Sequence, residues 1–222
     1  VPQLQRKGIV EPLLDREVLA DLSSGVHRAA FMKAYFDETG KHAQARVITI
    51  AGLLMSEKTC KELQRRWARE AARKPEIPLP FHMSDCVCGR KLFGYLKDDE
   101  GARLEMQKRL IHTMRGLDMQ AYGASVIRKE WKAHESELRS RPDYRDPWFF
   151  AFESSIQELM LRSKKAGKDH KISLVFDRQD EFKRRAFDLY NRMLETESAC
   201  RSRLGTLAFA ARDSLAALQA ID

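Results

Sequence analysis

Short apolar runs that alternate with helix-like segments constrain the fold of this chain more than any other feature. Strands are expected at Ala29–Asp37, Arg46–Met55, Gln120–Val126, Lys171–Asp177 and Leu204–Ala211. A turn at Glu38-Thr39-Gly40 and a short spacer join the first two, which favours an antiparallel hairpin. Apolar residues at helical spacing predict helices over 57–73, 102–117, 147–165 and 181–195. Strands that alternate with helices predict an α/β fold, in which helices cover a sheet.

Two segments stand apart from this alternation. Residues 1–30 are predicted to be a polar N-terminal arm before a domain at 31–222. Residues 75–118 are predicted to be a helical insertion after the second strand, since three prolines between residues 75 and 80 end the preceding helix. Residues 132–146 read as a charged loop. We expect Ser56, Asp146 and Ser214 to cap the helices that follow them.

The composition excludes several classes of protein. The 222 residues include 40 Lys and Arg against 32 Asp and Glu, a formal net charge of +8. This balance favours nucleic acid as a partner, although a basic surface that only aids solubility fits as well. Val47–Met55, the longest apolar run, is about half the ~20 residues that span a bilayer. No secretion signal is evident and the four cysteines make no disulfide framework, so we expect a cytoplasmic protein without a membrane partner.

The familiar nucleotide and hydrolase motifs are missing from the sequence. It contains no GxxxxGK[ST], GxGxxG, GxSxG or HExxH. Simple ATPase, dehydrogenase, esterase and zincin activities are therefore disfavoured.

Three aspartates lie where the hydrophobic pattern supports them. Asp37 ends the first predicted strand and Asp177 ends the run KISLVFD, although aspartate also ends strands because it favours turns. Asp222 shares a predicted helical face with Gln219. Three carboxylates at one spot would repel one another unless a divalent cation neutralised them. The pattern therefore predicts a metal site.

Glu153 is a fourth candidate ligand. It falls inside the apolar stripe of the helix at 147–165, between Phe149 and Ile156. A glutamate that faces a core is uncommon unless it is paired. The alternative is that Glu153 lies at the edge of the stripe and extends into solvent.

The segment FHMSDCVC offers two interpretations. His82 and Asp85 follow the proline-rich stretch and are placed to approach the acids from the insertion. His82, Cys86 and Cys88 could instead be zinc ligands in a small structural protein. The spacing C-x-C differs from the usual C-x₂-C, and a fourth ligand is not evident, which disfavours zinc.

The order of these motifs resembles domain-of-unknown-function family 3800 (DUF 3800). YFDETG at Tyr35–Gly40, followed by ITIAGLL, is similar to the opening of that family, and LVFDRQDEF to its later acidic strand end. FHMSD matches its histidine motif, and DSLAALQAID from residue 213 matches its closing signature. The resemblance spans about residues 31–222. Thr39 stands where the family usually has serine, and Ile221 where it usually has alanine.

The resemblance implies a ribonuclease H-like fold, a mixed sheet flanked by helices with acids at its centre. It also implies that Asp37, Asp177 and Asp222 are catalytic, metal-binding acids. Glu38, His82 and Gln219 are carried over as motif residues, the first two as catalytic candidates. The remaining motif residues are Ser214 and Asp85.

These expectations combine into a metal-dependent nuclease that hydrolyses DNA or RNA. Two Mg²⁺ or Mn²⁺ ions ~4 Å apart, bridged by Asp37, would activate water and stabilise the leaving oxygen, and His82 would protonate that oxygen or position the water. Basic helix faces would hold phosphates, unless they are merely solvated; their residues are Arg65, Arg66, Arg69, Arg73, Lys183, Arg184 and Arg185. The alternative is an inactive module of the same fold that binds nucleic acid or protein. The sequence leaves oligomeric state and protein partners open.

Overall fold

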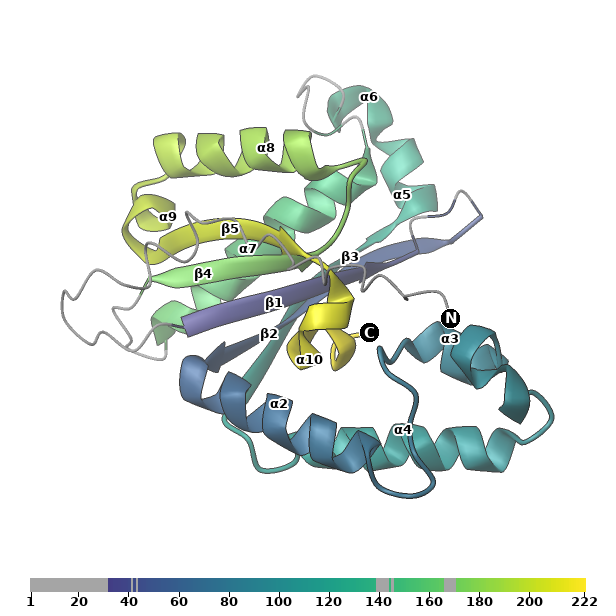
Figure 1. Cartoon of the computed structure of the whole chain (residues 1–222). Helices are drawn as coiled ribbons and strands as arrows, with labels where there is room; N and C mark the ends of the chain where they lie inside the picture. The colour runs from purple at the N-terminus through teal and green to yellow at the C-terminus, as the bar shows by residue number, and fades with distance from the viewer. Residues whose placement is uncertain (1–31, 41, 43, 139–143, 145, 166–170) are drawn as a thin grey trace, which may run out of the picture.

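A mixed five-stranded sheet forms the centre of the computed structural model (Figure 1). The structure describes residues 32–40, 42, 44–138, 144, 146–165 and 171–222, so the predicted arm at 1–30 lies outside the described residues. The strand order is β3-β2-β1-β4-β5. The strands are β1 (Met32–Thr39), β2 (Val47–Ser56), β3 (Met119–Ile127), β4 (Ile172–Asp177) and β5 (Leu204–Ala210). The first three pair antiparallel, whereas β4 runs parallel to β1, and β5 parallel to β4.

Helices cover both faces of this sheet. Between β2 and β3 lie α2 (Glu57–Ala71), α3 (Met83–Cys88), the 3₁₀ helix η1 (Lys91–Leu96) and α4 (Glu100–Met114). Between β3 and β4 lie α5 (Arg128–Ala133), α6 (Glu135–Leu138) and α7 (Pro147–Lys165). The remaining helices are α8 (Lys183–Thr196), α9 (Ser198–Arg203), η3 (Arg212–Ser214) and α10 (Ala216–Gln219). None of the helices in the described part of the chain has both the length and the apolar character needed to cross a bilayer.

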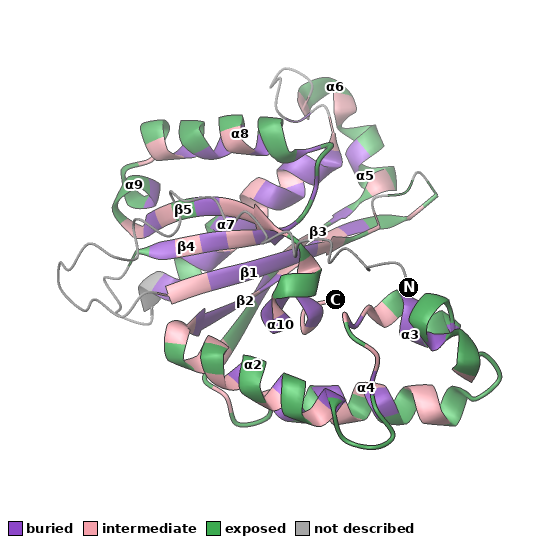
Figure 2. Cartoon of the chain, viewed as in Figure 1, coloured by how far each residue is buried: buried purple, intermediate pink, exposed green. Residues whose placement is uncertain are grey.

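Two hydrophobic clusters fill the layers on either side of the sheet. The larger cluster joins the sheet to α7, α8 and α9, and the smaller one joins it to α2, α3, α4 and α10. Figure 2 shows the buried stripes of α7 and α8 turned toward the sheet and their exposed sides turned outward. The predicted fold class, a mixed α/β sheet flanked by helices with a helical insertion after the second strand, is confirmed by this arrangement.

Strand alternation decides which side chains reach each layer. In β1, Ala34 and Phe36 point into the larger cluster, whereas Tyr35 points into the smaller one. The Phe36 ring stacks on Phe176 of β4, with centroids 4.6 Å apart. Gly52 in β2 makes room for Phe36, because a Cβ there would lie 2.4 Å from the ring. Asp37, the next residue, therefore faces the layer of the smaller cluster.

Two local predictions were wrong. Residues 132–146 are not all loop, because the chain forms α5 and α6 after β3. Ser214 does not cap α10, because its hydroxyl donates to the Ala211 carbonyl at 2.8 Å within η3 and Leu215 precedes the helix instead. Ser56 does cap α2, accepting from the Thr59 amide at 3.1 Å. Asp146 likewise accepts from the Trp148 amide at 2.8 Å at the start of α7.

Candidate active site

The ends of β1 and β4 bring two buried carboxylates together. Asp37 lies near the end of β1, and Asp177 is the last residue of β4. The strands are parallel neighbours with Phe36 opposite Phe176, so the two aspartates follow at the same edge of the sheet. Asp37 is 4% exposed and Asp177 9% exposed. The rigid centre of the sheet therefore fixes both carboxylates.

Asp222 joins these carboxylates by a route that differs from the predicted one. Helix α10 ends at Gln219, so Asp222 follows the helix and does not lie on its face. Its Oδ2 accepts from the Met83 amide at 2.6 Å and lies 3.1 Å from His82 Nδ1. The segment that begins α3 thus holds the third acid in place.

Arg212 lies at the centre of the three acids. Its Nη2 donates to Asp37 Oδ2 at 2.9 Å and to Asp177 Oδ2 at 2.7 Å. Its Nη1 lies 3.0 Å from Asp222 Oδ2. The side chain is 14% exposed. One guanidinium group therefore pairs with all three aspartates that were predicted as metal ligands.

Sequence reasoning missed Arg212, although a signal existed. Arg212 follows β5 by two residues, and β5 is the parallel neighbour of β4. Parallel strands end at the same edge of a sheet, so a cation just after β5 is expected near an acid at the end of β4. The parallel pairing of β4 and β5 is therefore the signal that locates Arg212 near Asp177.

Burial disfavours the ionised form of the Asp37 carboxyl group. Burial raises the pKa of the Asp37 carboxyl from 3.8 to about 6; Arg212 opposes this rise, and the charges of Asp177 and Asp222 add to it. The Glu38 amide donates to Asp37 Oδ1 at 2.9 Å and also favours the ionised form. For Arg212, burial lowers the guanidinium pKa, but the three carboxylates outweigh it and the net pKa is raised. Ionised carboxylates are tolerated in this buried cluster because they pair with the Arg212 guanidinium.

Gln219 positions the segment that carries Arg212 and Asp222. Its buried Oε1 accepts from Trp67 Nε1 at 3.2 Å and from the Phe81 amide at 2.9 Å. Its Nε2 donates to the Arg212 carbonyl at 3.2 Å. This motif residue thus links α2 and the proline-rich segment to the backbone of the acid cluster.

An open cleft of about 830 Å³ leads to the cluster. Glu38, His82, Asp177 and Arg212 are among the residues that line it. The Glu38 carboxylate accepts from the Gln179 amide. His82 is 39% exposed, so it is accessible from the cleft. A ligand in this cleft would contact the predicted motif residues Glu38 and His82 beside the aspartates.

Asp85 supports the insertion rather than the cluster. Its carboxylate pairs with Lys91 at 2.9 Å, and Arg90 lies 3.9 Å away. Burial acts to raise the Asp85 pKa, but the Lys91 hydrogen bond and the nearby positive groups lower it overall. These contacts join α3 to η1.

Glu153 does not reach the three aspartates. It lies on α7, which packs through Phe149 and Phe152 into the larger cluster, on the other side of the sheet. Its carboxylate accepts from the Tyr144 hydroxyl, and from Gln157 at 3.2 Å. The structure therefore gives this half-buried glutamate hydrogen-bond partners in place of a metal.

The zinc interpretation has no support in the geometry. Cys86 is buried and lies 3.7 Å from the Arg103 carbonyl, whereas Cys88 is exposed. Among the described residues no three His, Cys, Asp or Glu side chains are arranged to hold a metal ion in this conformation. For the aspartates, the guanidinium of Arg212 takes the central place.

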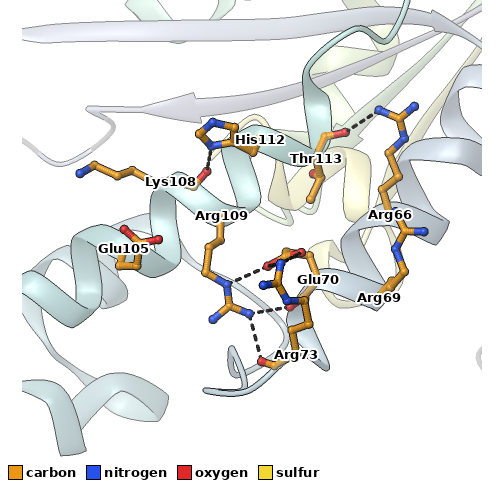
Figure 3. A pocket seen from close by; sticks show the side chains of 9 residues that line it. All are labelled: Arg66, Arg69, Glu70, Arg73, Glu105, Lys108, Arg109, His112 and Thr113. Carbon is orange, nitrogen blue, oxygen red and sulfur yellow. Dashed lines mark hydrogen bonds and ion pairs between the residues drawn. The ribbon is translucent and has the colours of Figure 1, made fainter.

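The basic residues divide between two surfaces. Arg66, Arg69 and Arg73 line a groove between α2 and α4 (Figure 3). Arg65 points elsewhere and pairs with Glu62 at 2.8 Å. The other predicted phosphate-binding residues are exposed on α8, in the layer on the opposite side of the sheet. They are Lys183, Arg184 and Arg185. Of these, Arg185 lies over the Phe149 ring, 4.1 Å from its centroid.

Comparison with known proteins adds little to this picture. No family model and no curated protein matches the chain. The chain is similar to a chain in the structure of the PCNA:RNase HII complex from Archaeoglobus fulgidus, with 15% identity, a TM-score of 0.43 and coverage of 86% of this chain and 68% of that one. A likeness this distant carries no argument about function. The DUF 3800 resemblance stays a prediction that rests on the motifs.

Proposed function

We propose that this protein is a metal-dependent nuclease that hydrolyses phosphodiester bonds of DNA or RNA. The observation that carries the proposal is the meeting of Asp37, Asp177 and Asp222 around one positive charge. Fold alone does not imply function, so the proposal depends on the chemistry of this site. Buried carboxylates at strand ends are costly without a cation, and the motifs that resemble DUF 3800 place their acids here.

The three side chains fit a hard divalent cation once Arg212 has moved. All of their donors are carboxylate oxygens, which Mg²⁺ and Mn²⁺ prefer. Asp37 and Asp177 bind the same nitrogen of Arg212, so their oxygens already lie within reach of a shared cation. When bound, the metal supplies Lewis-acid activation of water and of the scissile phosphate. The aspartates would therefore hold the metal only with Arg212 displaced from its place between them.

The residues of this chain have distinct roles in the proposed reaction. The three aspartates hold the cation, and Gln219 positions the segment that carries Arg212. His82, which is partly exposed beside Asp222, delivers a proton to the leaving oxygen. Once displaced, Arg212 remains at the cleft that it lines and pairs with the phosphate of the substrate.

Cleavage of labelled oligonucleotides in Mg²⁺ or Mn²⁺ tests this proposal. Single- and double-stranded DNA and RNA are offered separately, and Asp177→Asn is compared with Asp118→Asn. Asp118 is a matched control because it is exposed and directly precedes β3, at the end of the sheet opposite to Asp37. We expect Asp177→Asn to lower the cleavage rate by at least about 100-fold, and Asp118→Asn to retain it. Equal rates for the two variants would refute the assignment.

The paired state of Arg212 also favours a second candidate, an inactive module that binds nucleic acid. In that case the guanidinium permanently replaces a metal, and the protein binds oligonucleotides without turnover. Arg212→Met separates the two candidates. A nuclease should bind Mn²⁺ more tightly after this substitution, because the competing cation is removed. A module in which Arg212 has a permanent structural role should lose folding stability without gaining Mn²⁺ affinity.

A further inference from the structure

The groove between α2 and α4 is a separate basic surface. Its volume is about 520 Å³, and it is lined by Arg66, Arg69, Glu70, Arg73, Glu105, Lys108, Arg109, His112 and Thr113. Figure 3 shows these side chains arising from the two facing helices, except for Arg73, which lies on the turn after α2. Trp67 of α2 points the other way, toward Gln219. Helix α2 therefore separates the groove from the acid cluster.

Arg109 makes the floor of the groove a built structure. Its guanidinium donates to the Glu70 carboxylate at 2.8 Å. It also donates to the carbonyls of Glu70 at 2.9 Å, Arg73 at 3.0 Å and Pro75 at 2.7 Å. Arg109 is 13% exposed and Glu70 16% exposed. The partly buried arginine clamps the end of α2 onto α4, so the helix positions that carry the lining residues keep a fixed spacing.

Arg66 fixes the other end of the groove. Its Nε donates to the Glu62 carboxylate at 2.7 Å. Its Nη1 donates to the carbonyl of Arg115 at 3.0 Å and, more weakly, to that of Thr113 at 3.4 Å. Arg109 and Arg66 thus hold the two helices together. The side chains of the other cations in the lining, Arg69, Arg73 and Lys108, are not needed for this contact.

Arg69, Arg73 and Lys108 give the groove an excess of positive charge. The lining contains five Lys and Arg side chains against two carboxylates. Glu70 is already paired with Arg109 and, at 3.3 Å, with Arg73. The side chains of Arg69 and Lys108 are exposed and make no hydrogen bond or ion pair with any residue that the structure describes, whereas the Lys108 carbonyl accepts from His112 Nδ1 at 2.8 Å. Like charges held at a fixed spacing attract an anion that lies between them.

The lining also indicates the kind of anion. Among the described residues that line the groove there is no Phe, Tyr or Trp, and His112 supplies the one aromatic ring on which a base could stack. The two helices have 15 residues each, about 22 Å in length, so a chain of phosphates finds cations along an extended path. Contacts of this type position a nucleic-acid backbone without reading its bases.

We propose that the α2–α4 groove is a second nucleic-acid site, in which Arg69, Arg73 and Lys108 hold backbone phosphates away from the acid cluster. The proposal names a further substrate contact and rests on the proposed function only for the identity of the polyanion. Binding in the groove requires no divalent metal, since its ligands are cations.

Oligonucleotide binding in EDTA tests the groove independently of cleavage. A fluorescent single-stranded oligonucleotide is titrated at several salt concentrations with wild type, with Arg69→Ala/Lys108→Ala and with Lys58→Ala/Lys129→Ala. The second double variant removes the same charge at exposed side chains of α2 and α5 that do not line the groove. Thermal unfolding confirms that each variant is folded.

We expect the groove variant to bind more weakly and to reduce the slope of log affinity against log salt by about one for each side chain removed. The control should keep the wild-type slope. Equal losses in the two double variants would overturn the proposal, because general charge would then explain binding. If cleavage is never found but the groove variant alone loses affinity, the nuclease proposal fails and the groove proposal stands.

Discussion

Replacing Asp37 with asparagine should make this protein more stable at neutral pH, although it removes a proposed metal ligand. Asp37 is 4% exposed, and its pKa in the folded protein is about 6 against an ordinary value of 3.8. The folded state therefore binds the proton more tightly than the unfolded state does. As pH rises through this interval the unfolded state releases its proton first, and the folded state loses relative stability.

The magnitude follows from the size of this pKa shift. Each pKa unit corresponds to about 1.4 kcal/mol, so ionising Asp37 in the fold costs roughly 3 kcal/mol above pH 6. Asparagine has nearly the shape of the protonated carboxyl and carries no charge. Asp37→Asn should therefore raise the free energy of unfolding by up to about 3 kcal/mol at pH 7. The gain should decline below pH 6 and vanish near pH 4.

Urea unfolding at half-unit pH intervals, in EDTA, measures this difference. Asp180→Asn serves as a control, because Asp180 is exposed and its substitution should leave stability nearly unchanged at every pH. If Asp37→Asn destabilised the protein at pH 7, or if its effect were the same at pH 4 and pH 7, the electrostatic account of the cluster would be wrong.

Two further predictions concern residues outside the three acids. Gln219→Leu should lower the free energy of unfolding by about 3 kcal/mol, because it leaves Trp67 Nε1 and the Phe81 amide buried without an acceptor; a loss below about 1 kcal/mol by urea unfolding would contradict this role. Glu153→Gln should leave the metal-dependent cleavage rate unchanged, since α7 lies on the other side of the sheet; a large loss of rate in the same assay would return Glu153 to the site.

The elements of the sheet could be predicted from sequence because each strand carries its own signal. KISLVFD is an apolar run bounded by turn residues, and the structure has β4 at Ile172–Asp177. The hairpin of β1 and β2 likewise follows from local pattern, with Gly40 adopting a φ of 80° after the first strand. Asp177 follows the same logic, because a buried strand fixes the position of the residue that ends it, and Asp37 lies two residues before the end of β1.

Other features could not be predicted because they depend on contacts between distant segments. Asp222 reaches the cluster through the amide of Met83, and its helix is one turn long, so its helical periodicity was misleading. The position of Glu153 within an apolar stripe favoured a metal ligand. Its hydrogen-bond partner Tyr144 lies outside that helix, so the helical pattern could not indicate this pairing. Arg212 was not predicted because acids at strand ends indicate a balancing cation without distinguishing a metal ion from an arginine.

In the proposed nuclease, Asp37 and Asp177 would hold a divalent cation once Arg212 has left its place between them. The anomalous density of crystals soaked in Mn²⁺ shows whether they do. We expect a peak within coordination distance of oxygens of Asp37 and Asp177, with the Arg212 guanidinium moved away from both. Crystals saturated with Mn²⁺ that show Arg212 still paired with both aspartates, and no peak between them, would contradict it.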